Sequence, residues 1–312
     1  MASARFLYTT TKTSRATAYG FFSLVIDWIG AMTRFKGEIL IVLCTLAWGL
    51  SYLFSKTALP STGAINLVAL RFIVACVVTA LAFLPRTRQI GKPEIIFGSG
   101  LGTLLFGSSI LVAVGLKSTT VSNAGFIIGS MILAVAILDT VVRKEKPRLK
   151  LILGVGLAVF GIGVLTIRAD ISANPGDLYC FGGMLLLSIH VMVAQQAVRN
   201  ADPIGASIVQ FAATGCLALT ASVLTDNVFM IPRGEALLAV LALGVVGTAG
   251  GFVCQVIGQR FITPTRTAFI FTLEPVFATF FAWLFLGEPV TWHVYAGGGL
   301  LLAGVYVAEY DK

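Results

Sequence analysis

Apolar residues run in long, continuous stretches along most of this chain instead of alternating with polar ones. A hydrocarbon core about 30 Å thick requires about 20 helical residues, and a membrane β-barrel would show alternating segments instead. The stretches of suitable length are residues 39–58, 64–84, 95–116, 119–142, 149–167, 177–198, 205–224, 235–259, 265–286 and 292–309. We therefore predict an all-α membrane protein with ten transmembrane helices.

Composition and charge agree with this pattern. Hydrophobic residues make up 57% of the 312 residues and charged residues 12%, with a mean hydropathy of +0.93, whereas soluble domains carry about 25% charged residues. The net charge is +8, and 17 of the 22 basic residues fall on one side when the loops are assigned alternately to the two membrane faces. The positive-inside rule places that side, and both termini, in the cytoplasm. The basic loops lack interleaved aromatic residues, so nucleic acid is not a predicted partner.

Residues 1–36 form a separate N-terminal segment. The first 31 residues contain eight Ser or Thr residues, three basic residues and one acid. This composition is typical of a targeting leader, and equally of upstream sequence that precedes a start at Met32. After this segment we predict two domains, residues 37–168 and residues 177–309, with five spans in each.

The two predicted domains resemble each other in sequence. Residues 117–164 align without a gap on residues 260–307, with nine identities in 48 positions, including a loop glutamate followed by three glycines. Because five spans is an odd number, the second copy must enter the membrane from the opposite side. Transporters use such inverted repeats to expose a site at the membrane midplane alternately to the two sides.

Several motifs carry a resemblance to a known family. They are "LAWGLSYLFSKTAL" (46–59), "LRF" (70–72), "VSNAGFIIGS" (121–130) and "LEPVFATFFAWLFLGEPVTWHVYAGGGLLLAGV" (273–305). With these motifs the chain resembles the drug/metabolite transporter superfamily, in its ten-helix branch with two EamA domains. The resemblance implies a central cavity lined by both repeats and transport of small organic solutes, often outward, without naming the solute.

One segment departs from the family pattern. The family often has a proline in the fourth helix, where this chain reads "ILAVAILDT" (132–140). The resemblance therefore leaves a kink in the fourth helix open, and unequal bending of the two repeats is an alternative.

Glu274 and Pro275 lie together near the middle of the predicted ninth span. A carboxylate at this depth must face protein or a wet cavity, and burial favours its neutral form. Glu274 is thus a candidate for solute binding and for proton coupling; the alternative is a neutral acid that only fixes helix packing. Pro275 lacks a hydrogen-bond donor and clashes with the preceding turn, so we expect a bend there and assign it a structural role.

Other polar and aromatic residues within the spans extend the candidate site. His190 can relay protons or bind the solute, or be a packing histidine, and Trp48 and Tyr52 share one helix face. We interpret Arg71 as structural, bonded to backbone carbonyls, with anion binding as the alternative. The predicted solute-binding set is Trp48, Tyr52, Asn123, His190, Gln255 and Glu274, of which Glu274 and His190 are the coupling candidates.

Enzymatic motifs are missing from the sequence. There is no GxxxxGK[ST], HExxH or serine elbow, and the five cysteines lie inside predicted spans without a CxxC pair. We predict no catalytic residue, no metal and no cofactor. Glycines cluster in residues 154–163 and 297–304, which predicts close packing of the fifth and tenth helices, or a homodimer interface.

Together these features predict a secondary transporter in the cytoplasmic membrane. Its partners would be the lipid bilayer and a small organic solute, an amino acid or related metabolite, most simply exported by alternating access with proton coupling. A channel-like permease is the nearest alternative, because both need a polar path. A polytopic membrane enzyme is the second, disfavoured because no nucleophile, metal set or paired acids converge in sequence.

Overall fold

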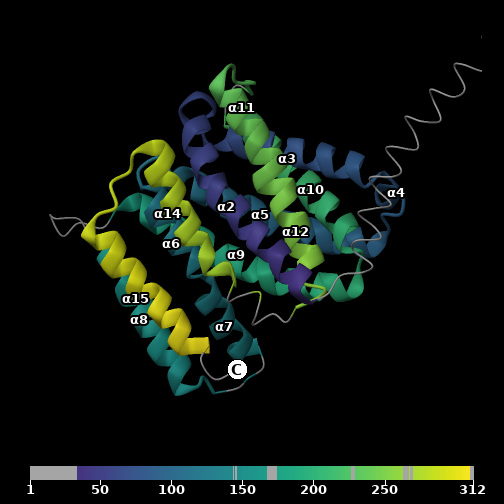
Figure 1. The fold of residues 1–312 in the computed structure, drawn as a ribbon. Coiled ribbons are helices and arrows are strands. Elements are labelled where there is room, and N and C mark those ends of the chain that lie inside the picture. Colours follow the sequence, from purple (N-terminus) through teal and green to yellow (C-terminus); the bar gives the residue numbers. More distant parts are fainter. Residues whose placement is uncertain are drawn as a thin grey trace, which may run out of the picture.

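The computed structural model describes residues 34–142, 144, 146–166, 174–225, 229–262, 267 and 270–309, and every regular element in these ranges is helical (Figure 1). Seven helical stretches are long and apolar enough to cross a membrane, and three shorter apolar helices accompany them. The long stretches are α2 (Arg34–Thr62), α3 (Ala64–Ala82), α5 (Lys92–Gly115), α6 (Val121–Gly129) with α7 (Met131–Val142), α9 (Pro175–Asn200), α10 (Pro203–Leu224), and α11 (Glu235–Ala242) through η1 (Leu243–Gly250) to α12 (Gly251–Gly258). The shorter apolar helices are α8 (Leu149–Thr166), α14 (Leu273–Leu286) and α15 (Trp292–Glu309), and α4 (Leu84–Thr87) is a single turn.

The predicted all-helical membrane architecture is confirmed, and most helix boundaries agree with the sequence within a few residues. The main difference is α2, which begins at Arg34, five residues before the predicted start at residue 39. That all ten helices cross a membrane stays a prediction. The proposed leader lies mostly outside the described residues, as do both ends of the chain.

Helices α8 and α15 pack along each other at one flank of the molecule (Figure 1). A Cβ built on Gly161 would lie 2.6 Å from the carbonyl oxygen of Gly297, and a Cβ on Gly304 would overlap the carbonyl oxygen of Gly154. The predicted close packing of the fifth and tenth helices is therefore confirmed within one chain. Gly156 and Gly299 of the same two clusters have no atom within 4 Å of an added Cβ, and a homodimer stays a prediction.

Positions that the repeat alignment pairs also share local structure. Lys144, after α7, and Gly287, after α14, both have positive φ, 56° and 64°, a conformation common where helices end. A second alignment, with an offset of 139 positions, extends the repeat to the earlier helices and pairs Phe72 with Phe211. The rings of these two residues contact each other with centroids 6.1 Å apart. One aligned pair thus shares a backbone conformation and another pair is in contact, while the inverted repeat itself stays a prediction.

The fourth predicted span is interrupted although it has no proline. Helix α6 ends at Gly129 and α7 begins at Met131, with Ser130 in a turn between them. The Ser130 hydroxyl donates a hydrogen bond to the Ile127 carbonyl at 2.6 Å, which offers the backbone a local alternative to the helical pattern. The helical pattern of the fourth span is thus interrupted without a proline, and the size of any kink stays open.

The ninth span is interrupted at Thr272, directly before α14. Pro275 lies in the first turn of α14, where its missing N–H costs no helical hydrogen bond. Its ring packs against α6, since a Cβ on Gly129 would lie 3.0 Å from Pro275 Cδ. Beside it, a Cβ on Gly125 would lie 2.7 Å from Ala278 Cβ. Glycines of α6 therefore let α14 approach closely beside the two breaks.

Candidate solute-binding site

A cavity of about 90 Å³, here called the central cavity, lies among side chains of α2, α3, α5, α6, α9, α12 and α14. Its lining includes Trp48, Ser51, Tyr52, Arg71, Phe252 and Glu274. The structure therefore brings together Trp48, Tyr52 and Glu274 from the predicted solute-binding set, and adds Arg71 to them.

Glu274 is the acidic residue in the lining of the central cavity, and 2% of its surface is exposed. The Tyr52 hydroxyl donates a hydrogen bond to Glu274 Oε1 at 2.8 Å. The other carboxyl oxygen, Oε2, is buried and has no hydrogen-bond partner among the residues that the structure describes. Since an unsatisfied buried polar atom is costly, this oxygen is suited to receive a proton or a cationic group of a ligand.

Arg71 reaches the central cavity from α3. Its Nε donates to the Thr248 hydroxyl at 3.0 Å, and its guanidinium carbon lies 4.9 Å from the centroid of the Phe72 ring, within cation–π range. The partner is thus a side-chain hydroxyl, not the backbone carbonyls that the sequence analysis favoured. Arg71 and Glu274 line the same cavity, yet the contacts of the described residues include no ion pair between them.

An unusual helix segment positions Thr248. It lies in η1, a π-helical stretch, and its hydroxyl donates to the Leu243 carbonyl, five residues earlier, at 3.0 Å. Wider helical turns of this kind frequently occur at functional sites. A Cβ on Gly244 would lie 2.6 Å from Val74 Cγ1, so the glycine lets α3, with Arg71, approach this segment.

Trp48 forms one wall of the central cavity. Its ring centroid lies 5.4 Å from that of Phe252 and 5.1 Å from that of Phe271. The indole approaches α12 closely, because a Cβ on Gly251 would lie 2.7 Å from Trp48 Nε1. These three aromatic residues form a cluster that we call the aromatic wall.

A second, smaller cavity holds His190 and Gln255, and we call it the histidine chamber. Its volume is about 20 Å³, enough for about one water molecule. His190 Nε2 lies 3.0 Å from Gln210 Oε1, while Nδ1 is buried without a partner among the described residues. Phe252 lines both cavities and meets the imidazole edge-on at 6.0 Å. His190 and Gln255 are therefore grouped together, but they are separated from Glu274 by a phenylalanine.

Asn123 lies apart from the other predicted residues. It is in the first turn of α6, where its backbone N–H donates to the Thr120 hydroxyl at 3.0 Å. None of the three cavities found among the described residues has Asn123 in its lining. Sequence reasoning instead missed Ser51, Phe252 and Thr248; a hydroxyl within the glycine-rich "GVVGTAGG" (244–251) was the available signal for Thr248.

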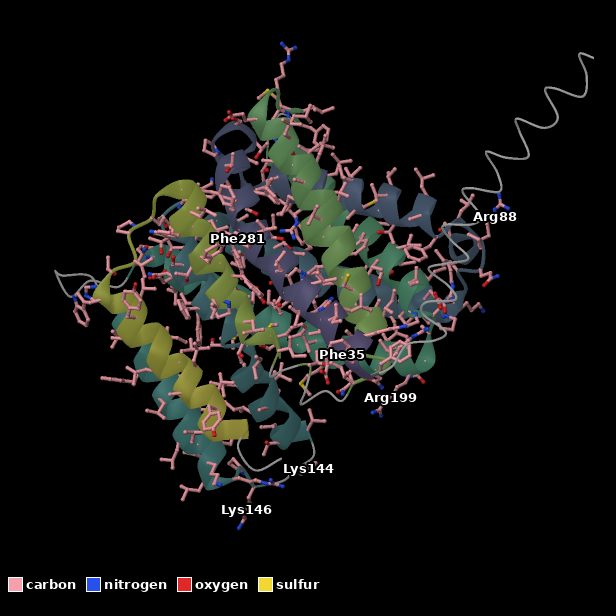
Figure 2. All side chains as sticks on the ribbon, viewed as in Figure 1. Phe35, Arg88, Lys144, Lys146, Arg199 and Phe281 are labelled. Carbon is pink, nitrogen blue, oxygen red and sulfur yellow. The ribbon has the colours of Figure 1, made fainter. Side chains whose placement is uncertain are left out.

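A larger cavity of about 410 Å³, the vestibule, lies beside the ends of α9 and α12. Its lining includes Gln195, Arg199, Gln259, Arg260, Thr267 and Phe271, and no acidic residue. Figure 2 shows Arg199 toward the same edge of the molecule as Lys144 and Lys146. The vestibule is thus at the basic end of the helices, which the sequence predicts to be cytoplasmic.

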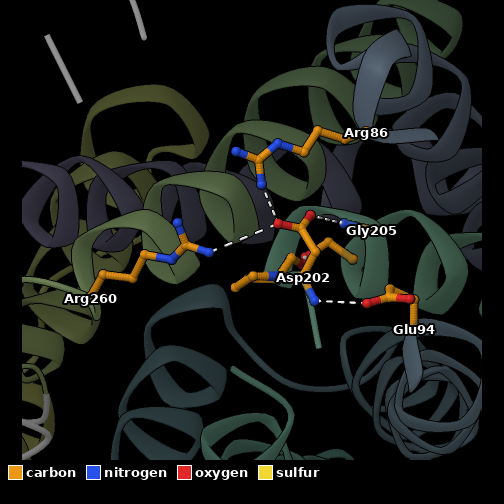
Figure 3. A network of polar contacts seen from close by, with 7 residues as sticks. Arg86, Glu94, Asp202, Gly205 and Arg260 are labelled. Carbon is orange, nitrogen blue, oxygen red and sulfur yellow. Dashed lines mark hydrogen bonds and ion pairs between the residues drawn. The ribbon is translucent and has the colours of Figure 1, made fainter. Parts of the chain in front are cut away.

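A polar network borders the vestibule (Figure 3). Asp202 forms an ion pair with Arg86, and its Oδ1 lies 3.9 Å from Arg260 Nη2. The Asp202 backbone N–H donates to Glu94 Oε1 at 2.9 Å, and its Oδ2 accepts from the Gly205 N–H at 2.9 Å. This network ties α4, α5 and α10 to the chain that follows α12.

The opposite end is joined by hydrogen bonds. Glu288 Oε1 accepts from the Val121 backbone N–H at 3.0 Å, and its Oε2 accepts from the Ser122 hydroxyl at 3.2 Å. Lys56 Nζ donates to the carbonyl oxygens of Leu116 at 2.7 Å and Thr119 at 2.5 Å. Neither of these long-range contacts is visible in the hydrophobic pattern or in the motifs of the sequence. Glu288 caps α6, a helix from the other half of the chain.

Comparison with known proteins identifies the family. A model of the EamA-like transporter family matches residues 35–167 and 174–310. The chain belongs to this family, and the membership predicted from its motifs is confirmed.

Relatives of known name are transporters. An uncharacterized transporter of Archaeoglobus fulgidus is 27% identical over 279 residues, which cover 88% of this chain and 86% of the relative. An S-adenosylmethionine/S-adenosylhomocysteine transporter of Chlamydia trachomatis serovar D is 24% identical, covering 88% and 89%. A probable amino-acid metabolite efflux pump of Salmonella typhimurium is 25% identical, covering 87% and 94%. These matches run over most of the length of each chain.

A solved crystal structure resembles this fold with a TM-score of 0.67 at 21% identity, covering 87% of this chain and 95% of the other. At this identity the likeness concerns the fold alone. Family, relatives and apolar helices together make the chain a multi-pass membrane transporter. Its family and its named relatives point to transport, not to an enzyme.

Proposed function

We propose that the protein is a secondary carrier for a small organic solute, an amino acid or related metabolite, which it exports across the cytoplasmic membrane by alternating access. The observation that carries this proposal is the central cavity, where the buried Glu274 Oε2 has no partner among the described residues. Two relatives named for S-adenosylmethionine/S-adenosylhomocysteine transport and for amino-acid metabolite efflux support the solute class. S-adenosylmethionine and S-adenosylhomocysteine both contain an α-amino acid group.

The proposed architecture is ten membrane-spanning helices in two inverted repeats, residues 37–168 and 177–309, with both termini in the cytoplasm. Reciprocal contacts support it: Gly161 meets Gly297, and the aligned positions Gly304 and Gly154 meet in the same way. An exchange of partners between aligned positions is what a twofold relation between halves produces. The interruptions at Ser130 and Thr272, within one aligned position of each other, add to this support.

The distribution of open and closed regions favours a carrier over a channel-like permease. The vestibule lies at the basic end, the aromatic wall stands between it and the central cavity, and the opposite end is joined through Glu288 and Lys56. Movement of the aromatic wall would connect the central cavity to the vestibule while the opposite end stays joined, so a solute would reach one side at a time. Alternating access requires such one-sided opening.

Proton coupling is assigned first to Glu274 and second to His190. Glu274 lines the central cavity, so protonation of its carboxyl group and binding of a cationic solute group would compete directly. His190 has one ring nitrogen bonded to Gln210 and lies in the histidine chamber, so it would act on the solute only through other groups.

Counterflow in proteoliposomes tests the carrier. Vesicles would be loaded with pooled L-amino acids or with S-adenosylmethionine, and uptake of the same labelled solute would be measured. We expect saturable uptake that the internal solute accelerates. Flux without such acceleration would contradict the carrier and favour a channel. Arg88→Gln is a suitable control, because Arg88 is exposed and lines none of the three cavities.

A further inference from the structure

The central cavity contains one positive and one negative side chain that do not neutralise each other directly. Arg71 uses its Nε for Thr248, and Glu274 uses Oε1 for Tyr52. No described residue bonds to the terminal nitrogens of Arg71 or to Glu274 Oε2. A buried carboxyl oxygen without a partner is unfavourable, and Arg71 presents the opposite charge to the same cavity. The arrangement therefore suits a ligand that contacts both side chains.

We propose that the central cavity is a two-point site for the zwitterionic head group of an α-amino acid, with the carboxylate on Arg71 and the ammonium on Glu274. This inference rests on the proposed function and names the solute class of that same site. An α-amino acid carries both charges on one carbon atom, so a single small group meets both side chains. The cavity charges sum to zero, which suits a zwitterion better than a net anion or cation.

The hydrogen bonds already present fix each charge in a useful orientation. Because Thr248 occupies Arg71 Nε, the two terminal nitrogens remain for a carboxylate, which a guanidinium binds as a paired fork. Because Tyr52 occupies Glu274 Oε1, the free Oε2 remains for the ammonium group. Each internal hydrogen bond therefore uses only one polar atom of the charged group and leaves the other polar atoms available for a ligand.

The size of the cavity limits what it can hold. Its volume of about 90 Å³ is several times the roughly 10–15 Å³ that one water molecule needs in a cavity, and well below that of a drug-sized pocket. A head group fits, and a long side chain must extend elsewhere. Trp48 and Phe252 line the cavity and also belong to the aromatic wall, so an apolar side chain would lie against aromatic rings.

Truncated ligands test the two contacts separately. Binding to the purified full-length protein would be measured by calorimetry with L-alanine, propionate and ethylamine. The larger set is L-methionine, 4-(methylthio)butanoate and 3-(methylthio)propylamine. We expect at least one amino acid to bind at least tenfold more tightly than both of its truncated forms. Failure of both amino acids to bind, or equally tight binding of a truncated form, would overturn the inference.

Charge-removing variants assign each contact. Glu274→Gln should weaken amino-acid binding at least tenfold and leave the deaminated acids unchanged, whereas Arg71→Gln should weaken the amino acids and leave the amines unchanged. Thr248→Val, which keeps the charge but removes the Nε partner, should weaken amino-acid binding by a few fold, and Arg88→Gln should not alter it. Equal losses for all ligands in both charge variants would contradict the two-point site. If Arg71→Gln does not fold, the ligand series on the unaltered protein still decides.

The outcome can be separated from that of the proposed carrier. Saturable counterflow of a solute without an α-amino acid group, combined with no amino-acid binding, would retain the carrier and reject the two-point site. Loss of counterflow for every solute would reject the carrier itself.

Discussion

The central cavity and the histidine chamber lie on either side of Phe252. The two regions differ in how their polar side chains are hydrogen-bonded. The repeat alignment pairs Ser51 with His190 and Arg71 with Gln210, so the two regions use corresponding positions of the two halves. In the histidine chamber, the imidazole and the amide bond to each other at 3.0 Å. In the central cavity, the charged groups bond to Tyr52 and Thr248 but not to each other. The comparison teaches that corresponding positions of the two halves can bond directly to each other, as His190 and Gln210 do, or bond to separate partners and leave their charged atoms to face a cavity.

The two cavities also differ in volume. The histidine chamber has about 20 Å³ and the central cavity about 90 Å³. In the histidine chamber the buried His190 Nδ1 lacks a partner among the described residues, and the space of about one water molecule suits a bound water. The central cavity has more room and two side chains of opposite charge, which suits a larger ligand. We therefore expect substitutions to have unequal effects in the two regions.

The largest effect is expected from Glu274→Gln. Glutamine cannot take up a proton, so transport driven by an imposed pH gradient should fall at least tenfold in proteoliposomes. Tyr52→Phe keeps the carboxyl group and removes one hydrogen bond, worth about 1 kcal/mol, so it should retain gradient dependence. Unchanged gradient dependence in Glu274→Gln would remove proton coupling from this residue.

An intermediate effect is expected from Phe252→Ala, which joins the two regions. Removal of this buried ring should lower the free energy of unfolding by about 3 kcal/mol or more, measured as a lower melting temperature. It should also expose His190, now 2% exposed, to acylation by diethyl pyrocarbonate, read by mass spectrometry of its peptide. His293, the other histidine of the chain, is the internal control. Unchanged labelling of His190 would show that Phe252 does not separate the regions.

The smallest effect is expected from His190→Gln. The new amide can still bond to Gln210, so counterflow and its gradient dependence should stay within about twofold of the unaltered protein, as for the loss of one ordinary hydrogen bond. A loss of gradient dependence as large as that of Glu274→Gln would instead make the histidine chamber part of the coupling mechanism.

The sequence predicted the helices well because length and apolar continuity determine membrane-spanning helices directly. It also brought Trp48, Tyr52 and Glu274 together, since depth along a span and helical spacing are visible in one dimension. It did not reveal that Asn123 falls outside the linings of the three cavities described above, because a cavity begins at a depth that only packing determines. The separation of His190 from Glu274 depends on Phe252, whose place between them is a tertiary contact.

Two further structural features, the break at Ser130 and the partner of Arg71, lack the sequence pattern that would usually predict them. The break at Ser130 occurs without proline, through a hydroxyl that bonds to the Ile127 carbonyl. The partner of Arg71 is Thr248, which is placed by a π-helical segment. A wider helical turn changes which residues face a neighbouring helix, and the hydrophobic pattern does not reveal such a local change of period.

The glycine contacts between α8 and α15 have a mechanical consequence. At Gly161 and at Gly304 the two backbones approach so closely that an added Cβ would collide with a carbonyl oxygen. Sliding one helix along the other would bring larger side chains to these points. We therefore expect the two helices to resist sliding and to move together as one rigid pair. Although α8 and α15 come from different halves of the chain, any large conformational change would then move other helices relative to this pair, and not α8 relative to α15.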